Sequence, residues 1–457
     1  MKPTPSQRNP APGRPRERAA APEADRALAS RRLAASAFRR VLEKGAALDD
    51  ALAEAGARLP ALDERDARLA RSILTVALKR LGTLRQALDV CLKTPLAQSP
   101  PDLAAILTTA AAQLLFMGVP DHAAVDSAVA LTRADRRIAG LSGVANAVLR
   151  RIAAERKAIL DRHDPCADLP GWLIQRWRLA YGPERTARIA AALGQEPTLD
   201  ITPLSDPEGW AERLGGRLLP TRSIRLISHD PVPALPGYAD GAWFVQDAAA
   251  AIPARLLDTK PGERVLDLCA APGGKTAQLA ATGAAVTAID RSSARLGRLR
   301  QNLARLGLKA DIIAADAAAW AGEPADAILL DAPCASTGTI RRHPDVAWTK
   351  TETDIASLAA LQARLLDHAA GLLKPGGRLV YSTCSLEPEE GERQIETLLE
   401  RRRDLALDAV LPAEAPALGA AIDERGALRI TPDLWPAEEA RLSGLDGFYA
   451  ARLRRVG

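Results

Sequence analysis

Two cysteines stand where this sequence most readily supports chemistry. Cys334 follows a proline in DAPCASTG and Cys384 lies in YSTCS, each shortly after an apolar run of strand length. A thiolate is a strong nucleophile, but a free thiol has a pKa of about 8.5, so a site that uses one must lower that pKa or remove the proton. A single cysteine is more often a small buried apolar residue, which is our interpretation of Cys91 and Cys166. Two thiols at the strand ends of one sheet instead indicate covalent catalysis.

A glycine-rich segment at 267–276, DLCAAPGGKT, is the candidate ligand loop. Gly274, Lys275 and Thr276 match the second half of the phosphate-binding pattern GxxxxGK[ST], but Cys269 occupies the position of its first glycine. The dinucleotide pattern GxGxxG is also absent from the sequence. A nucleotide hydrolase and a NAD-dependent enzyme are therefore disfavoured. What remains is a tight turn of small residues, which lets the backbone approach a bulky ligand closely.

Acidic residues end the next two predicted strands. Asp290 ends AVTAID, where a carboxylate can accept two hydrogen bonds from ribose hydroxyls. Asp316 ends ADIIAAD, in position to meet an adenine edge. A glycine turn and two acidic strand ends without a phosphate loop suit an adenosyl group that has no phosphate chain, namely S-adenosylmethionine. An aspartate at a strand end is also a common helix cap, and spacing alone leaves that alternative open.

The cysteines narrow down the atom that would receive a methyl group. Methyltransferases that act on exocyclic amines tend to place an aromatic residue after the fourth strand, where this chain has Cys334. Carbon 5 of cytosine is a poor nucleophile until a thiolate adds to carbon 6 and turns the ring into an enamine. Methylation of carbon 5 therefore requires a cysteine. On the residues alone, Cys334 and Cys384 are both candidates for that thiolate.

The elements that would position these residues form an α/β domain at 237–457. From Val245 onward, most of the apolar runs of strand length are separated by helical stretches; the runs are RVLDLCA, AVTAID, ADIIAAD, ADAILLDAP and RLVYSTC. This alternation predicts a Rossmann-like fold, with a parallel sheet and helices on both of its faces. Ligands of such sheets bind beyond the carboxyl ends of the strands, which is where the glycine loop and both thiols lie.

Two further domains precede this one, so the predicted fold class is multidomain. Residues 25–160 show helical periodicity without a strand signal and without a cluster of His, Cys or paired carboxylates. This pattern predicts an all-α bundle that serves as a scaffold or binding module. Residues 161–236 mix the helical stretch GWLIQRWRLAYG with short apolar runs and predict a small α+β connector. The tryptophans of that stretch are interpreted as core residues.

Basic charge is concentrated near the start of the chain. The 457 residues include 61 Lys and Arg against 56 Asp and Glu, yet residues 1–40 alone have a net charge of +7 and the rest a net charge of −2. The prolines within 1–24 predict a disordered basic tail. Such a tail either attracts a polyanion or is simply solvated, and charge alone does not separate the two.

Composition disfavours several other classes of protein. The five cysteines form no CxxC pair and no zinc spacing, so we expect no metal site, no disulfide framework and a reducing cytoplasm. The sequence has no apolar run of about 18 residues and no apolar segment near its beginning, so we expect neither a membrane span nor a signal peptide.

Taken together, the motifs DLCAAPGGKT, DAPCASTG and YSTCS resemble the first, fourth and sixth motifs of the RNA (cytosine-5) methyltransferases of the Sun (RsmB) family. LPGYADGAWFVQDAAA, IRRHPDVAW and DGFYAARL are similar to segments of its bacterial 16S ribosomal RNA members. Those members have an N-terminal all-α domain that resembles the antitermination factor NusB, and SGVANAVLRR is similar to theirs. The resemblance implies a NusB-like RNA-binding domain at 25–160 and an S-adenosylmethionine-dependent catalytic domain at 237–457.

The resemblance also implies a set of site residues. Cys384 would be the nucleophile, and Cys334 would assist the elimination that frees the methylated RNA. Asp331 would in addition meet the cytosine edge, where a carboxyl group stabilises charge that develops on the ring. The residues implied to hold S-adenosylmethionine are Cys269, Ala270, Ala271, Pro272, Gly273, Gly274, Lys275, Asp290, Asp316 and Asp331. Where relatives usually have an RVN-like strand, this chain reads DIT at 200–202, which leaves one expected RNA contact open.

The predicted function is methylation of carbon 5 of a specific cytosine in 16S small-subunit ribosomal RNA, through a covalent bond between a cysteine and the cytosine. The target base must be flipped out or single-stranded, because the thiol cannot reach a stacked ring. The expected partner of the monomeric chain is RNA, either naked or within a partly assembled subunit. Arg341 and Arg342 are predicted to hold its phosphates.

Three alternatives remain at this point. One is methylation of transfer RNA or another RNA. A second is DNA cytosine-5 methylation, which predicts attack by Cys334 and a large target-recognition insert, although nothing after Cys334 resembles such an insert. The third is a non-catalytic NusB-like RNA-binding or antitermination protein, which the intact glycine-rich and cysteine motifs oppose.

Overall fold

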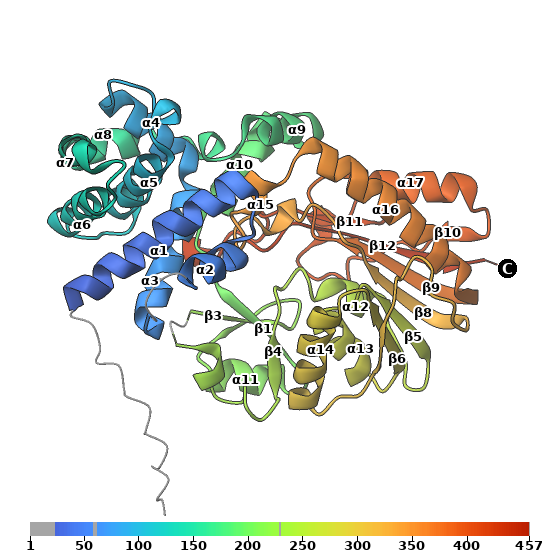
Figure 1. The fold of residues 1–457 in the computed structure, drawn as a ribbon. Coiled ribbons are helices and arrows are strands. Elements are labelled where there is room, and N and C mark those ends of the chain that lie inside the picture. The colour runs from blue at the N-terminus through green and yellow to red at the C-terminus, as the bar shows by residue number, and fades with distance from the viewer. Residues whose placement is uncertain (1–22, 58–61, 228–229, 457) are drawn as a thin grey trace, which may run out of the picture.

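The structure, a computed structural model, describes residues 23–57, 62–227 and 230–456. Along the chain these residues form a helical bundle, a small mixed α and β region and a large sheet domain (Figure 1). The predicted multidomain fold class is therefore confirmed. The predicted basic tail at 1–24 lies outside the described residues, apart from its last two, with which the first helix begins.

The helical bundle has the amphipathic pattern that its sequence predicts. Its helices are α1 (Glu23–Lys44), α2 (Leu48–Gly56), α3 (Glu64–Lys79), α4 (Leu81–Cys91), α5 (Pro101–Phe116), α6 (Asp121–Ala134), α7 (Ser142–Ala154) and α8 (Arg156–Asp161). In α3, Ile73, Leu74, Ala77 and Leu78 are buried on one face, as expected for apolar residues spaced three or four apart. Helix α5 is almost wholly apolar and lies at the centre, where it packs against α1, α3, α4, α6 and α7.

The connector joins two helices to a small antiparallel sheet. Its elements are α9 (Gly171–Tyr181), α10 (Pro183–Gly194), β1 (Leu199–Pro203), α11 (Pro207–Arg213), β2 (Arg217–Leu218), β3 (Ile224–Leu226) and β4 (Trp243–Val245). The strand order is β2-β3-β1-β4, so the small sheet includes a strand that lies beyond the predicted boundary at 236. Trp177 in α9 is fully buried, which confirms its interpretation as a core residue.

The large domain alternates strands and helices in its first half. Its elements are α12 (Ile252–Leu256), β5 (Arg264–Leu268), α13 (Gly274–Ala281), β6 (Ala285–Asp290), α14 (Ser293–Leu306), β7 (Asp311–Ala314), β8 (Ala325–Asp331), α15 (Val346–Thr349), α16 (Glu352–Gly371), β9 (Leu373–Thr383), α17 (Glu392–Arg401), β10 (Leu405–Leu407), β11 (Leu428–Ile430) and β12 (Phe448–Arg455).

The large sheet is mixed rather than purely parallel. Its order is β10-β12-β9-β8-β5-β6-β7, with β11 also paired to β12. The five strands from β9 to β7 are parallel, as the sequence predicts. Strand β12, however, runs antiparallel to β9, with Ala451 opposite Tyr381. The prediction missed this edge because β12 follows β11 and loop segments rather than a crossover helix, so the alternation that indicates a parallel pair is absent there.

Helices cover both faces of the sheet because its central strands are apolar on both sides. In β5, Leu266 packs with α16 and α17 on one face, while Val265 packs with α12 and α13 on the other. The same alternation continues in β8 and β9. Figure 1 shows α16 and α17 on one side and α12, α13 and α14 on the other. This packing fixes the carboxyl ends of β5, β8 and β9 relative to one another.

The helical bundle contacts the large domain directly. The backbone N–H of Leu48 donates to Asp345 Oδ2 at 3.1 Å, and the indole N–H of Trp348 donates to the Leu78 carbonyl at 3.0 Å. Trp348 also packs against the core of the bundle. Both Asp345 and Trp348 belong to the segment IRRHPDVAW, so the bundle supports a loop of the large domain.

None of the helices in the described ranges is both long and apolar enough to span a bilayer.

Candidate active site

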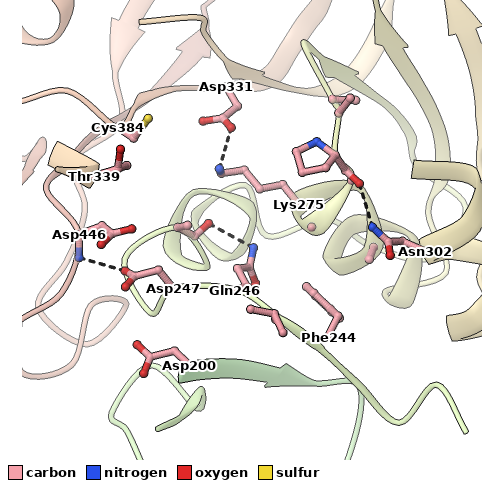
Figure 2. A pocket seen from close by; sticks show the side chains of 18 of the residues that line it. Asp200, Phe244, Gln246, Asp247, Lys275, Asn302, Asp331, Thr339, Cys384 and Asp446 are labelled. Atoms are coloured by element: carbon pink, nitrogen blue, oxygen red, sulfur yellow. Dashed lines mark hydrogen bonds and ion pairs between the residues drawn. The ribbon is translucent and has the colours of Figure 1, made fainter. Parts of the chain in front are cut away.

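A cavity of about 610 Å³ opens at the carboxyl ends of the central strands (Figure 2). Its wall combines parts of the large domain with the segment 244–247, which leads in from the connector sheet. The predicted site residues that line it are Ala270, Ala271, Pro272, Gly273, Gly274, Lys275, Asp331 and Cys384. The structure therefore brings most of the glycine loop, one acidic strand end and one thiol to a single site.

Glycine is needed at the turn of the ligand loop. Gly273 has φ +103°, and a Cβ there would lie 2.8 Å from Cγ of Leu299. The next residue, Gly274, begins α13, and a Cβ on it would come within 3.4 Å of the Gln246 side chain. The lack of a side chain at Gly273 therefore leaves room for Leu299 of α14, and the lack of one at Gly274 leaves room for Gln246, which lines the cavity.

Asp267, at the end of β5, provides a buried acceptor in the cavity wall. The Thr276 hydroxyl donates to its Oδ2 at 2.5 Å, while its Oδ1 has no partner among the described residues. Burial raises the pKa of Asp267 to about 7, and the hydrogen bond from Thr276 acts in the opposite direction. The sequence reasoning gave Asp267 no ligand role, although an acidic residue at a strand end before a glycine loop was a signal for one.

Lys275 and Asp331 form an ion pair across the cavity, with Nζ 2.7 Å from Oδ2 (Figure 2). The Ser382 hydroxyl donates to the other carboxylate oxygen at 3.0 Å, and the Lys275 ammonium lies 4.9 Å from the centre of the Phe448 ring. Ser382 and Phe448 were not predicted, because they come from β9 and from the antiparallel strand β12. Their contacts hold a cation beside the thiol of Cys384.

The two cysteines at the ends of β8 and β9 are in contact. Their sulfur atoms lie 3.4 Å apart, and the Ser336 Oγ is 3.5 Å from the sulfur of Cys384 and 3.9 Å from that of Cys334. Cys384 lines the cavity, whereas Cys334 lies behind it. Adjacent parallel strands thus place both predicted thiols within reach of one reacting atom.

The surroundings of the two thiols shift their pKa values in opposite directions. The hydrogen bond from Cys334 lowers the pKa of Cys384 against the effects of burial and Asp331, and Ser336 and the charge of Lys275 lower it further. The hydrogen bond to Cys384, burial and the charge of Glu390 raise the pKa of Cys334 well above its ordinary value. These shifts favour the thiolate form at Cys384 and the S–H form at Cys334.

Three predicted ligand residues do not line the cavity. Asp290 is buried and accepts hydrogen bonds from the backbone N–H of Ala271 at 3.1 Å and of Ser292 at 2.8 Å, so it supports the glycine loop from behind. Asp316 is exposed, two residues beyond the end of β7, and accepts from a backbone N–H. Cys269 lies at the start of the loop, and burial raises its pKa to about 12. Their roles in holding a ligand remain predictions.

The two arginines after the fourth motif are paired with carboxylates, and Arg341 is buried. Arg341 is 3% exposed, and its Nε lies 2.6 Å from Asp446, while Arg342 pairs with Asp247 at 2.7 Å. Although burial opposes its ionisation, the two arginines hold the pKa of Asp247 below its usual value. The prediction of phosphate contacts was wrong for Arg341, because the carboxylates that occupy it lie about a hundred residues away in sequence; for Arg342 it stays a prediction.

The cavity is also lined by five residues from the loops around this cluster, namely Asp247, Thr339, Arg342, His343 and Asp446. None of the five was proposed as a lining residue from the sequence. The carboxylate of Asp200, within the segment DIT, also lines it and pairs with the guanidinium of Arg225 at 2.7 and 2.8 Å.

No group of three or more His, Cys, Asp or Glu side chains in the described part of the chain is arranged to hold a metal ion. All five cysteines are free. Cys91 packs against the core of the bundle and Cys166 against a cluster around Trp177, in keeping with their interpretation as apolar packing residues.

Two family models match the chain. One is described as 16S rRNA methyltransferase RsmB/F and matches residues 254–454. The other is the NusB family and matches residues 28–154. The two matches correspond to the large sheet domain and to the helical bundle, respectively.

Individual proteins match over most of the chain. A protein from Salmonella paratyphi B named ribosomal RNA small subunit methyltransferase B is 38% identical over 409 residues, which cover 84% of this chain and 93% of that protein. A crystal structure of PH0851 superposes with a TM-score of 0.72 at 25% identity and covers 94% of this chain and 99% of its own. A crystal structure of a methyltransferase homologue from Pyrococcus horikoshii is 30% identical with a TM-score of 0.53 and covers 62% of this chain and 94% of its own.

Proposed function

The chain belongs to the RsmB/F family of 16S rRNA methyltransferases, and from that premise we propose that it methylates carbon 5 of a cytosine through a transient covalent bond to Cys384. The observation that carries the proposal is the pair of thiols 3.4 Å apart at the edge of the cavity, one with a lowered and one with a raised pKa. Transfer to an exocyclic amine would need neither thiol.

The cavity fits S-adenosylmethionine as the methyl donor. Its glycine turn exposes backbone without forming a complete phosphate loop, and Asp267 Oδ1 is a buried acceptor that still lacks a donor. A ligand with an ammonium group and hydroxyl groups, but no phosphates, satisfies both features. The residues proposed to hold it are those of 269–275 together with Asp290, Asp316 and Asp331. When bound, this group supplies a methyl carbon made electrophilic by its sulfonium.

Cys384 begins the reaction. Its thiolate forms a bond to carbon 6 of the cytosine, and the electron pair of the ring double bond shifts so that carbon 5 becomes nucleophilic. Lys275 and Ser336 favour the thiolate, since both lower the pKa of Cys384. Carbon 5 then takes the methyl group, and the ring remains bound to the enzyme through sulfur.

Cys334 acts in the release step. A solvent water molecule takes the proton from carbon 5, the electron pair of that carbon–hydrogen bond re-forms the double bond between carbons 5 and 6, and the sulfur of Cys384 departs with the electron pair of its bond to carbon 6. Cys334 lies 3.4 Å from that sulfur and can donate its S–H to the departing thiolate. Asp331 meets the cytosine edge, where its carboxylate stabilises positive charge on the ring.

The proposed substrate is 16S rRNA, bound by a monomer in the cytoplasm, with the NusB-like bundle as an additional RNA-binding part. The target cytosine must leave its stack to enter a cavity of this depth. The bundle buttresses the loop that leads from Thr339 to Trp348 along the cavity, which would couple RNA binding on the bundle to the site.

Trapping on 16S rRNA transcribed with 5-fluorocytidine tests the proposal. Fluorine blocks loss of the carbon-5 substituent, so the wild-type protein should form a covalent adduct that survives denaturation and depends on S-adenosylmethionine. Cys384→Ala should form none. An adduct lost in Cys334→Ala but retained in Cys384→Ala would assign the attack to Cys334 and contradict the proposal.

A further inference from the structure

Glu390 lies directly behind the thiol pair and is fully buried. It ends a short 3₁₀ turn, Pro388–Glu390. Both oxygens of its carboxylate accept from the backbone N–H of Ala335, at 3.0 and 3.1 Å. Ala335 is the residue after Cys334, so the carboxylate of Glu390 holds the loop that carries this thiol.

The backbone of Glu390 holds the other thiol-bearing segment. Its carbonyl oxygen accepts from the Tyr381 hydroxyl at 2.8 Å and from the Thr383 hydroxyl at 3.1 Å. Thr383 is the last residue of β9 and directly precedes Cys384. A single residue therefore contacts the neighbours of both cysteines.

Gln362 of α16 completes this arrangement from the opposite side. Its amide nitrogen donates to Glu390 Oε1 at 3.0 Å and to the carbonyl of Pro333 at 2.8 Å. Pro333 and Ala335 flank Cys334, so the loop is held on both sides of the thiol. Gln362 is also fully buried.

The loop needs such support because its backbone is strained. Ser336 has φ +59°, in the left-handed region that a residue with a side chain rarely occupies. Strained residues persist where the surrounding structure determines their conformation. Two contacts constrain the backbone before the strained position. The N–H of Ala335, one residue before Ser336, donates to Glu390, and Gln362 donates to the carbonyl of Pro333.

Glu390 also places negative charge next to one thiol. The hydrogen bonds to its carboxylate come from neutral donors, namely Ser385, Ala335 and Gln362. Burial raises the pKa of Glu390, and the charge of Glu390 contributes to the raised pKa of Cys334. A carboxylate on this side favours the S–H form of Cys334 and has no comparable effect on Cys384.

We propose that Glu390, assisted by Gln362, is a positioning residue that holds Cys334 against the sulfur of Cys384 and so sets the rate of RNA release. This inference rests on the proposed function, in which Cys334 assists release. The inference predicts different effects on the two steps. Loss of the Glu390 carboxylate should slow release of the RNA and leave formation of the cysteine–cytosine bond nearly unchanged.

Single-turnover measurements on unmodified 16S rRNA transcript test the inference, with Glu390→Gln compared with Glu389→Gln. Glu389 is the preceding residue, but it pairs near the surface with Arg176 at 2.9 Å and Arg393 at 3.1 Å. Glu390→Gln should form the adduct at a nearly wild-type rate and release it about tenfold to a hundredfold more slowly, since small misplacements of a reacting group have effects of this size. Glu389→Gln should behave as the wild type.

Two further variants test the positioning role of Glu390 independently of the single Glu390→Gln substitution. If Glu390→Gln does not fold, Gln362→Met removes the bonds to Glu390 and Pro333 and should slow release in the same way. In a Cys334→Ala background, Glu390→Gln should have no additional effect on release, because it acts through Cys334. Additive effects, or equal slowing of adduct formation and release, would overturn the positioning role while leaving the proposed function intact. If the wild type formed no adduct on 5-fluorocytidine RNA, the proposed function would fail, and the inference with it.

Discussion

The ends of β8 and β9 carry the same functional group in different surroundings. Cys384 faces the cavity, with the ammonium of Lys275 among the groups that lower its pKa. Cys334 is not among the residues that line the cavity; its hydrogen bond to Cys384 and burial raise its pKa, and the charge of the buried Glu390 raises it further. The two sulfur atoms are nevertheless only 3.4 Å apart.

This difference shows how one sheet edge can hold two thiols with separate tasks. On the cavity side, the positive charge of Lys275 favours a thiolate that attacks. A negative charge on the far side favours a thiol that keeps its proton until the bond to the RNA must break. The opposite pKa shifts come first from the hydrogen bond between the two thiols, and the charges of Lys275 and Glu390 add to them.

Removal of the Cys334 thiol should have the largest effect on the difference between the two cysteines. In Cys334→Ala, the adduct through Cys384 should still form on unmodified 16S rRNA transcript but persist, so that multiple-turnover methylation falls by about 10²- to 10⁴-fold, the range of a lost proton-transfer group. Denaturing electrophoresis with labelled RNA measures the adduct, and release of methylated RNA measures turnover. Normal turnover without adduct accumulation would contradict the assignment of Cys334 to release.

Removal of the Lys275 ammonium tests how much the charge on the cavity side contributes to the difference between the two thiols. Lys275→Met should raise the pKa of Cys384, because the charge of Lys275 lowers it in the wild type. Less thiolate is then present at neutral pH, and the acidic limb of the pH profile of kcat/KM should move to higher pH. At neutral pH we expect a loss of about tenfold to a hundredfold, typical of one electrostatic contact at a reacting centre.

Lys275→Arg is the matched control, since it keeps the charge and should keep the acidic limb near its wild-type position. A Lys275→Met profile that fell equally at every pH would show that Lys275 acts in binding alone.

The site residues that could be predicted from the sequence are those that lie in a recognisable motif next to a predicted strand. Cys384, Lys275 and Asp331 each follow or end an apolar run, and parallel strands end at one edge, so these residues could be placed together before the structure was known. The same reasoning recovered the bundle, because apolar spacing alone predicts amphipathic helices.

The remaining features depend on contacts between distant segments. Asp247 and Arg341 meet across a sequence separation of 94 residues, and nothing local to either residue indicates the pairing. Ser382 is brought to Asp331 by strand pairing, and Phe448 to Lys275 by the antiparallel strand β12. Asp316 follows a strand as predicted, but β7 ends two residues earlier, at Ala314, and Asp316 does not line the cavity, so its role in holding a ligand stays a prediction.

The smallest effect is expected where the two thiols share a neighbour. The Ser336 hydroxyl lies within 4 Å of both sulfur atoms, so Ser336→Ala removes a contact from each without changing the charges that distinguish them. We expect adduct formation and release to slow together, by about twofold to tenfold, the value of one hydrogen bond. Stopped-flow mixing with labelled transcript separates the two rates. Selective slowing of adduct formation would mean that Ser336 belongs to the Cys384 side, as a hydroxyl that stabilises the thiolate alone.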